Sequence, residues 1–494
     1  MFRSRLCLCV FCGLLGLAAW LLAAPPSASA QDKKNLSFID DVAPILAKNC
    51  FSCHSSKTKK GKLDMTTFES FRKGGTKDDP IEPGAAKKSI IIQVLTSSGK
   101  ARMPPVDVAP KPLPPETVAV IANWIDQGAK LDTGLDAKAD LVRELRVRFK
   151  PEMPKETYPR PPIINALAFT PDSKKIVVGG YQELTVWDVA TGKLEKRVWT
   201  RAERALSMVF LPDGTLAVAG SRPGREGDVR IYNINAAPAK TIGAVPILDG
   251  VHDKSVLVKD LVQTDDSMHV VALSPDGKKL AAAGVDKIVR VWDLASGKLE
   301  HSIENHADWV FGLAFSPDGK HLATASRDKT AKLWDLEAKE SVLTFPDHAN
   351  GVNSVVMAPD GKSGISCGED GNIRQWQATD MAKNLGKQIK VIGSHGKPVI
   401  QMVYRADPKN PMIATAGADG TIKVWNATSG AAIKTLTGLT DWAYSAALSP
   451  NGELAAGGTF NGEVGIWKIA DGKIAQQFLA APGYVAKAPE VKKK

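Results

Sequence analysis

Two thiols and an imidazole lie within five consecutive positions, in the segment Cys50-Phe51-Ser52-Cys53-His54. Two cysteines at this spacing can each add to a vinyl group of one porphyrin, and a histidine directly after the second cysteine can bind the iron. The segment therefore predicts one covalently attached haem c, held by Cys50 and Cys53, with His54 as the proximal iron ligand.

Three other uses of a close cysteine pair agree less well with the sequence. A thioredoxin-like redox pair is expected between a strand and a helix, and the neighbouring residues do not show that context. A structural zinc site needs one or two further cysteine or histidine ligands, and residues 31–161 contain none beyond the motif. A disulfide would leave His54 without a role.

The opposite face of the iron needs a second ligand, or it stays open. No other histidine precedes His252, so a second imidazole from this part of the chain is excluded. The candidates are Met65 and Met103, and Met103 lies in a stiff, proline-rich segment, 49 residues after His54. We predict Met103 as the distal iron ligand, which would raise the haem potential. Met65 and a vacant or water-bound iron are the alternatives.

The elements that position this site are expected to be helices. Apolar residues recur at helical spacing just before the motif and again near residue 120: Phe38, Val42, Ile45 and Leu46, then Val118, Ile121, Ala122 and Ile125. Pro115 and Gly128 mark the start and the end of the later helix. Two such helices and a haem predict a small all-α domain over residues 31–133. Because its apolar interior is thin, we expect haem attachment and folding to be coupled.

The N-terminus has the features of a secretory signal peptide. Arg3 and Arg5 precede an apolar run that ends at Ala24, and Ala28-Ser29-Ala30 fits the site that a signal peptidase reads. We predict that residues 1–30 are removed and that the mature chain is periplasmic, without a membrane span. An uncleaved membrane anchor is the alternative, because the apolar run could nearly span a bilayer.

The C-terminal part is repetitive. A Pro-Asp-Gly turn or a close variant recurs six times, each after a short apolar run. Seven strands are expected to end in an aromatic residue: Trp187, Tyr232, Trp292, Trp334, Trp376, Trp425 and Trp467. Three of the six intervals are 42 residues, a period typical of four-stranded propeller blades. We predict a connector over residues 134–161, a seven-bladed β-propeller over 162–480 and a basic tail over 481–494.

Two family resemblances agree with this division. Residues 38–131 resemble the planctomycete-type cytochrome c domain in the haem motif and in four further segments: Val42-Ala43-Pro44-Ile45-Leu46, Ile81-Glu82-Pro83-Gly84, Met103-Pro104-Pro105 and Trp124-Ile125-Asp126-Gln127-Gly128-Ala129. That resemblance implies haem on Cys50 and Cys53, His54 as proximal ligand and Met103 as distal ligand. Residues 162–480 resemble WD-repeat proteins, with intact Trp-Asp pairs at 187–188, 292–293 and 334–335.

The WD-repeat resemblance implies further features of the blades. In the fourth blade a hydrogen-bonded chain is expected to link four residues: His306, Ser326, Asp328 and Trp334. Gly284, Gly368 and Gly417 replace Ser326 in three other blades, so their chain is expected to be incomplete. The outer strand of the last blade is expected from residues 473–479, or else from residues 144–149. Insertions at residues 221–228 and 246–267 are expected on one face, where they would bind a partner.

These features predict an exported, non-enzymatic electron-transfer protein in which a small all-α c-type cytochrome domain precedes an all-β, seven-bladed WD-repeat propeller. Electrons would pass through a haem ligated by His54 and Met103 to a redox protein, and the propeller would make protein–protein contacts. The basic run at residues 57–62 is a solvated loop or steers an acidic redox partner. The net charge of +11 is scattered and no nucleic-acid motif occurs, so no nucleic-acid partner is expected. The alternatives are an interaction protein whose haem is a sensor or a structural staple, and an oxidoreductase with an active site in the propeller.

Overall fold

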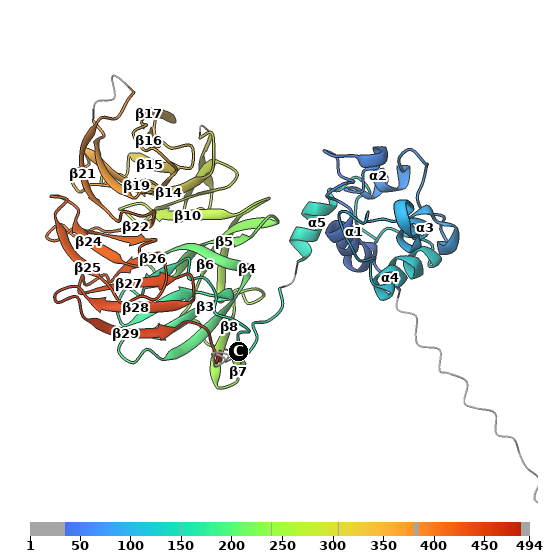
Figure 1. Ribbon diagram of the computed structural model, residues 1–494, viewed down its shortest axis with the longest axis horizontal. Coiled ribbons are helices and arrows are strands. Elements are labelled where there is room, and N and C mark those ends of the chain that lie inside the picture. The colour runs from blue at the N-terminus through green and yellow to red at the C-terminus, as the bar shows by residue number, and fades with distance from the viewer. Residues whose placement is uncertain (1–34, 150, 239, 305, 380–383, 486–494) are drawn as a thin grey trace, which may run out of the picture. The chain divides into compact units, whose positions relative to one another are not determined.

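The computed structural model describes residues 35–149, 151–238, 240–304, 306–379 and 384–485 (Figure 1). The chain divides into two compact units, a helical one that ends at Arg148 and a β-rich one that begins at Phe149. The predicted order of an all-α domain and an all-β propeller is therefore confirmed. The predicted signal peptide and most of the predicted tail lie outside the described residues. Within the described ranges, no helix combines the length and the apolar composition that a membrane crossing requires.

The helical unit is built from short helices around one apolar core. Its elements are η1 (Phe38–Val42), α1 (Ala43–Asn49), η2 (Lys60–Lys62), α2 (Phe68–Lys73), η3 (Ala86–Lys88), α3 (Ile90–Thr96), η4 (Gly99–Ala101), α4 (Pro115–Asp126) and α5 (Leu141–Arg148). The two expected amphipathic segments are confirmed, because Leu46 and Ile121 are at most 1% exposed. The rings of Phe38 and Trp124, with centroids 5.2 Å apart, join the two segments.

Helix α5 lies within the stretch that the sequence analysis assigned to a connector. Leu141 is fully buried in the helical core, and its N–H donates to the carbonyl of Thr66 at 2.8 Å. Leu141 and Leu145 lie four residues apart, so both face that core from one side of the helix. Because α5 includes residues 144–148, the alternative in which residues 144–149 supply a propeller strand is wrong.

The first two blades of the propeller form one continuous sheet. Strand β4 (Leu194–Phe210) is long enough to serve both: its first half pairs with β3 and its second half with β5. Blade 1 also contains β1 (Leu167–Phe169), β2 (Lys175–Gly179) and β3 (Tyr181–Asp188), and blade 2 contains β5 (Leu216–Arg222), β6 (Glu226–Tyr232) and β9 (Leu257–Thr264). An inserted hairpin of β7 (Lys240–Ile242) and β8 (Val245–Asp249) pairs in parallel with the first half of β4.

The other five blades are separate antiparallel sheets of four strands (Figure 1). Blade 3 contains β10 (Met268–Leu273), β11 (Lys279–Gly284), β12 (Ile288–Asp293) and β13 (Leu299–Glu304); blade 4 contains β14 (Val310–Phe315), β15 (His321–Ser326), β16 (Ala331–Asp335) and β17 (Glu340–Phe345); blade 5 contains β18 (Val352–Met357), β19 (Ser363–Gly368), β20 (Asn372–Gln377) and β21 (Gln388–Ser394); blade 6 contains β22 (Val399–Arg405), β23 (Met412–Gly417), β24 (Ile422–Asn426) and β25 (Ala432–Leu436); blade 7 contains β26 (Ala443–Leu448), β27 (Leu454–Thr459), β28 (Glu463–Lys468) and β29 (Ile474–Leu479). The described residues thus form the seven blades that the repeat period predicts.

The recurring Pro-Asp-Gly turns hold the first two strands of a blade together. In blade 3 the carboxylate of Asp276 accepts the hydroxyl of Ser274 at 2.6 Å and the N–H of Lys278 at 3.0 Å. Gly277 adopts a φ of 71°, which disfavours a side chain. The turn therefore specifies the register of the hairpin locally, before any contact between blades is made.

The ring closes without exchanging a strand between its ends. Strand β29 pairs with β28 of its own blade, as one of the two alternatives predicts. The segment that enters blade 1 bonds to blade 7 instead: the N–H of Ile164 donates to Thr459 at 3.0 Å, and the N–H of Tyr158 donates to Pro482 at 3.0 Å. Backbone hydrogen bonds from this entering segment thus stabilise the junction between the first and last blades.

A buried ion pair anchors the same entering segment. The guanidinium of Arg197 donates to both carboxylate oxygens of Glu183, at 2.6 and 2.8 Å, and to the carbonyl of Lys155 at 2.8 Å. The hydroxyl of Tyr158 donates to the same carboxylate at 2.5 Å. The side chains of Arg197 and Glu183 are at most 1% exposed, so the pair is shielded from water.

The hydrogen-bonded chain of the blades differs from the prediction. In blade 4 the indole of Trp334 donates to the hydroxyl of Thr324 at 3.0 Å, and Thr324 and Asp328 contact the two ring nitrogens of His306. Ser326 is not the link, because Trp334 pairs across from Leu322 and its indole reaches only the diagonal neighbour, Thr324.

Blades 5 and 6 carry the same chain, so the prediction that they lack it is wrong. The hydroxyls of Ser366 and Thr415 take the place of Thr324, and each accepts a tryptophan indole N–H, at 3.2 and 3.1 Å. The same hydroxyls contact His348 and His395, each at 2.8 Å. The glycines at the Ser326 position therefore do not interrupt the chain.

We expect the propeller to lose stability as the pH falls below neutral. Burial lowers the pKa of His348 and His395, and it lowers the pKa of His269 to about 4. The pKa of these histidines in the unfolded chain is about 6.5, so below that pH the unfolded chain binds protons that the buried imidazoles do not. Each such histidine therefore lowers the free energy of unfolding by up to about 1.4 kcal/mol per pH unit. Urea unfolding at pH 7 and pH 5 measures this loss. His269→Phe should reduce it, whereas His252→Gln, an exposed position, should not; equal stability at both pH values would contradict the prediction.

The prediction that residues 221–228 and 246–267 share one face of the propeller is wrong for the segment before β9; residues 265–267, after β9, do lie at the end of the blade where β5 turns into β6. Residues 221–228 are the paired ends of β5 and β6, and Arg222, Glu226 and Asp228 are buried there. The loop after β8 lies between the third and fourth strands of blade 2, so it emerges at the opposite end of the blade from the β5–β6 turn. In addition, Lys259 donates to the carbonyl of Leu294 rather than standing free.

Candidate haem site

The cysteine motif forms a tight turn at the end of α1. The N–H of Cys50 still donates to the carbonyl of Leu46 at 2.8 Å, but the backbone of Cys50 leaves the helical conformation. The N–H groups of Cys53 and His54 both return to the carbonyl of Cys50, at 3.1 and 2.9 Å. Both thiols are half-buried and neither is in a disulfide. The three predicted site residues thus share one compact turn.

His54 is held in the tautomer that a metal ligand needs. Its Nδ1 lies 2.9 Å from the carbonyl oxygen of Lys60. A carbonyl only accepts, so Nδ1 carries the proton and Nε2 carries the free lone pair. No hydrogen bond to Nε2 occurs within the described part of the chain. The imidazole is therefore oriented by one nitrogen and able to ligate a metal with the other.

The basic run after the motif supplies this orientation through its backbone. The N–H of Lys60 donates to the carbonyl of Cys53 at 2.9 Å, and the N–H of Met65 donates to the carbonyl of His54, also at 2.9 Å. Lys59 and Gly61 adopt φ values of 42° and 65°, so the chain turns sharply around the motif. Sequence reasoning treated this run as a charge pattern and missed its structural role.

The thiol chemistry differs from that of a redox-active cysteine pair. Burial, with a smaller contribution from Cys53, raises the pKa of the Cys50 thiol to about 12. Cys50 is therefore a neutral thiol at neutral pH, whereas a thioredoxin-like nucleophile needs a lowered pKa. The donor set of two unpaired thiols and one free imidazole nitrogen fits the attachment of a haem.

The two candidate methionines lie in different environments. Met65 is 3% exposed and packs in the helical core. Met103 is 38% exposed, and its N–H donates to the carbonyl of Val94 at 2.9 Å, which fixes the loop between η4 and α4. Val106 and Val108 in the same loop are more than half exposed. An exposed apolar loop with an accessible thioether fits a surface that an apolar cofactor covers.

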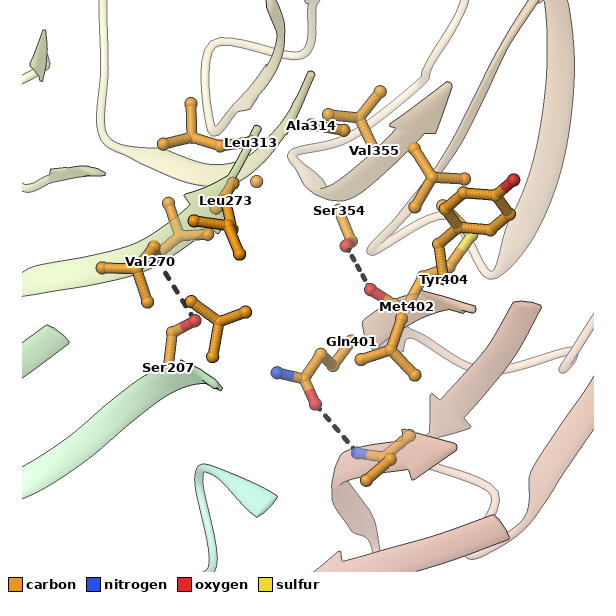
Figure 2. Close-up of a pocket in the computed structure, with 18 of the residues that line it drawn as sticks. Ser207, Val270, Leu273, Leu313, Ala314, Ser354, Val355, Gln401, Met402 and Tyr404 are labelled. Atoms are coloured by element: carbon orange, nitrogen blue, oxygen red, sulfur yellow. Dashed lines mark hydrogen bonds between the residues drawn. The ribbon is translucent and has the colours of Figure 1, made fainter. Parts of the chain in front are cut away.

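The inner strands of the propeller enclose a second candidate site, a cavity of about 1000 Å³. Figure 2 shows its wall, where Val270, Leu273, Leu313 and other apolar side chains predominate. Its polar groups join neighbouring blades: Ser207 accepts the N–H of Val271 at 3.2 Å, Ser354 donates to Met402 at 3.0 Å, and Gln401 accepts the N–H of Ala446 at 2.8 Å. In the ranges that the structure describes, no group of three histidine, cysteine or acidic side chains is arranged to hold a metal.

The fold and the motif define a cytochrome c domain joined to a WD-repeat propeller. Residues 50–107 match the family described as Planctomycete cytochrome C. Residues 257–293, 297–335, 339–377 and 386–426 match the WD domain, G-beta repeat. The chain therefore carries a planctomycete cytochrome c domain, which is a haem domain, followed by WD40 repeats, which are a protein-interaction scaffold.

Curated proteins similar to this chain match it over part of its length. The probable serine/threonine-protein kinase PkwA of Thermomonospora curvata is 46% identical over 50 residues, 10% of this chain and 7% of that protein. Protein groucho of Drosophila melanogaster is 31% identical over 138 residues, 27% of this chain and 16% of groucho. Protein ROOT INITIATION DEFECTIVE 3 of Arabidopsis thaliana is 27% identical over 158 residues, 31% of this chain and 33% of that protein. The chain thus spans at most a third of the length of these relatives.

Proposed function

We propose that this chain is an exported electron-transfer protein with one haem c. Thioether bonds to Cys50 and Cys53 attach the haem, His54 and Met103 ligate its iron, and the propeller binds a protein partner. The observation that carries the proposal is the hydrogen bond between Nδ1 of His54 and the carbonyl of Lys60, inside a turn that also presents two unpaired thiols.

The residues of the turn have distinct roles. The two thiols would hold the haem through thioether bonds; addition of each S–H across a vinyl group accounts for every atom, with nothing oxidised or released. His54 Nε2 would bind the iron while the carbonyl of Lys60 holds the ring in place. The thioether of Met103 would be a second iron ligand and would favour the reduced iron. The bound haem supplies reversible one-electron chemistry.

The propeller and the basic loop would select the partner. Lys57, Lys60 and Lys62 are exposed next to the motif, so they would attract an acidic surface toward the haem. The blades offer a rigid scaffold with connecting turns at both ends of each sheet, which suits contacts with a second protein. In this proposal the cytochrome domain transfers electrons and the propeller binds the protein partner, so the two units have separate roles.

Purified periplasmic protein from a host that attaches haem to cysteine tests this function. We expect the mass of one haem on the mature chain, a Soret band, and a sharp α band on reduction. Mature protein that carries no porphyrin mass and no Soret absorbance would overturn the redox function.

Met103→Ala should identify the distal ligand. Loss of the thioether is expected to disturb the reduced α band and to lower the midpoint potential, because thioether ligation raises the potential. Met65→Leu is the matched control: its side chain is buried in the helical core, and a volume-conserving change should leave the spectrum as it is. Spectra unaffected by Met103→Ala would remove Met103 from the iron, and a change confined to Met65→Leu would assign the ligand to Met65.

A further inference from the structure

Arg102, directly before Met103, is buried, and no carboxylate among the described residues pairs with it. It is 5% exposed, and one terminal nitrogen donates to the carbonyl of Ala109. Its Nε is buried and forms no hydrogen bond within the described chain. Asp107 lies in the same loop, but it is exposed and forms no ion pair with Arg102. The guanidinium therefore has a carbonyl to bond to and no carboxylate.

The other buried arginines of this protein all have carboxylate partners. Four arginines of the described residues are buried, and three of them lie in the propeller. There Arg197 contacts Glu183 at 2.6 Å, Arg222 contacts Glu226 at 3.4 Å, and Arg230 contacts Asp228 at 2.5 Å. Burying a charge is costly unless an opposite charge compensates it, and these three follow that rule. Arg102 is the exception, and it lies in the helical unit next to the predicted iron ligand.

A missing anion would account for this exception. Three acidic side chains of the helical unit are engaged elsewhere: Asp79 pairs with Arg72 at 2.7 Å, Asp126 accepts the N–H of Ala86 at 2.8 Å, and Asp132 accepts the N–H of Ile39 at 2.8 Å. Haem carries two propionate carboxylates, and guanidinium groups bind carboxylates through paired N–H donors. The cofactor would therefore bring the negative charge that the chain does not provide at this position.

We propose that Arg102 binds a propionate carboxylate of the haem and positions the porphyrin. This inference rests on the proposed function, because it needs a haem on Cys50 and Cys53. Nε and the remaining terminal nitrogen are the donors, while the bond to Ala109 fixes the side chain in the loop. The positive charge next to the cofactor would also favour the reduced iron and so raise the midpoint potential.

Charge-removing variants of the haem-loaded, full-length protein test the role of Arg102. Arg102→Gln should lower the midpoint potential while the α band that reports Met103 ligation is retained, and Arg102→Lys should restore part of the potential. Arg72→Gln is the matched control, since it removes the same charge from an arginine that already has a carboxylate partner. In the reduced wild-type protein, the Nε–H of ¹⁵N-labelled Arg102 should exchange with water more slowly than those of exposed arginines.

The possible results separate this inference from the function on which it rests. An unchanged potential in Arg102→Gln, or fast exchange of the Nε–H in the wild type, would overturn the role of Arg102 and leave the haem protein intact. If the midpoint potential of Arg102→Gln fell only together with loss of the α band, Arg102 would act by stabilising the loop that carries Met103. That result would also overturn the proposal. The wild-type exchange measurement keeps the test decisive if a variant fails to fold. Absence of Soret absorbance in the wild type would overturn both proposals.

Discussion

Replacing Cys50 and Cys53 together with alanine is expected to abolish covalent haem binding and to unfold much of the helical unit. Helices α1, α2 and α3 contain only six or seven residues each, below the roughly 12–15 at which isolated helices become marginally stable. Their stability must come from a shared core, and the haem would be the largest apolar group in it. Mass spectrometry and the Soret band measure attachment, and the circular dichroism of the mature chain measures the loss of helix.

Cys367→Ala is the control for this experiment. Cys367 is fully buried in β19 of the propeller, so its removal takes away a thiol without affecting the motif. Haem content should then stay at one per chain. Full haem content in the double variant would rule out thioether attachment at Cys50 and Cys53. Unchanged helix content in the haem-free double variant would show that attachment and folding are independent.

Arg197→Met should cost the propeller about 3–5 kcal/mol in its free energy of unfolding, because it leaves the Glu183 carboxylate buried without a cation. The loss should be seen as a lower urea midpoint. The matched control is Lys175→Met, which breaks an ion pair with Glu195 of the same 2.6 Å length whose side chains are about a third exposed. That pair should contribute no more than about 1 kcal/mol.

A second variant separates charge from shape at this position. Combining Arg197→Met with Glu183→Leu removes both charges, so part of the lost stability should return. Equal destabilisation by Arg197→Met and Lys175→Met would contradict this prediction. It would show that the buried ion pair is not needed to hold the Tyr158 segment between the first and last blades.

The sequence predicted those parts of the structure that depend on neighbouring residues. The seven blades were predictable because a local turn, as at Asp276 and Gly277, sets the first hairpin, and all blades except the sixth carry that turn or a close variant. The grouping of Cys50, Cys53 and His54 was predictable for the same reason, since the three residues lie in one turn of the backbone. Trp187 and Tyr232 are 45 residues apart, which is close to the repeat period. The spacing therefore did not reveal that β4 belongs to two blades.

The parts that were not predicted depend on backbone groups or on register. The partner of His54 is the carbonyl of Lys60, and a carbonyl has no side-chain signature in a sequence. Thr324 was missed because the correct hydroxyl depends on which residue Trp334 faces across β15 and β16. The alternation of Leu145, Val147 and Phe149 suggested a strand over residues 144–149, but residues 141–148 form α5, whose Leu141 is buried in the core of the helical unit.

The shared strand β4 makes the propeller unequal around its ring. In a repeat array, stability is approximately the sum of the units and of the contacts between neighbours, so each unit can open at its two borders. Between blades 1 and 2 there is no such border, because one continuous strand, β4, pairs with strands of both blades. We therefore expect these two blades to unfold as one cooperative segment, and partial opening of the ring to begin in the five separate blades that follow.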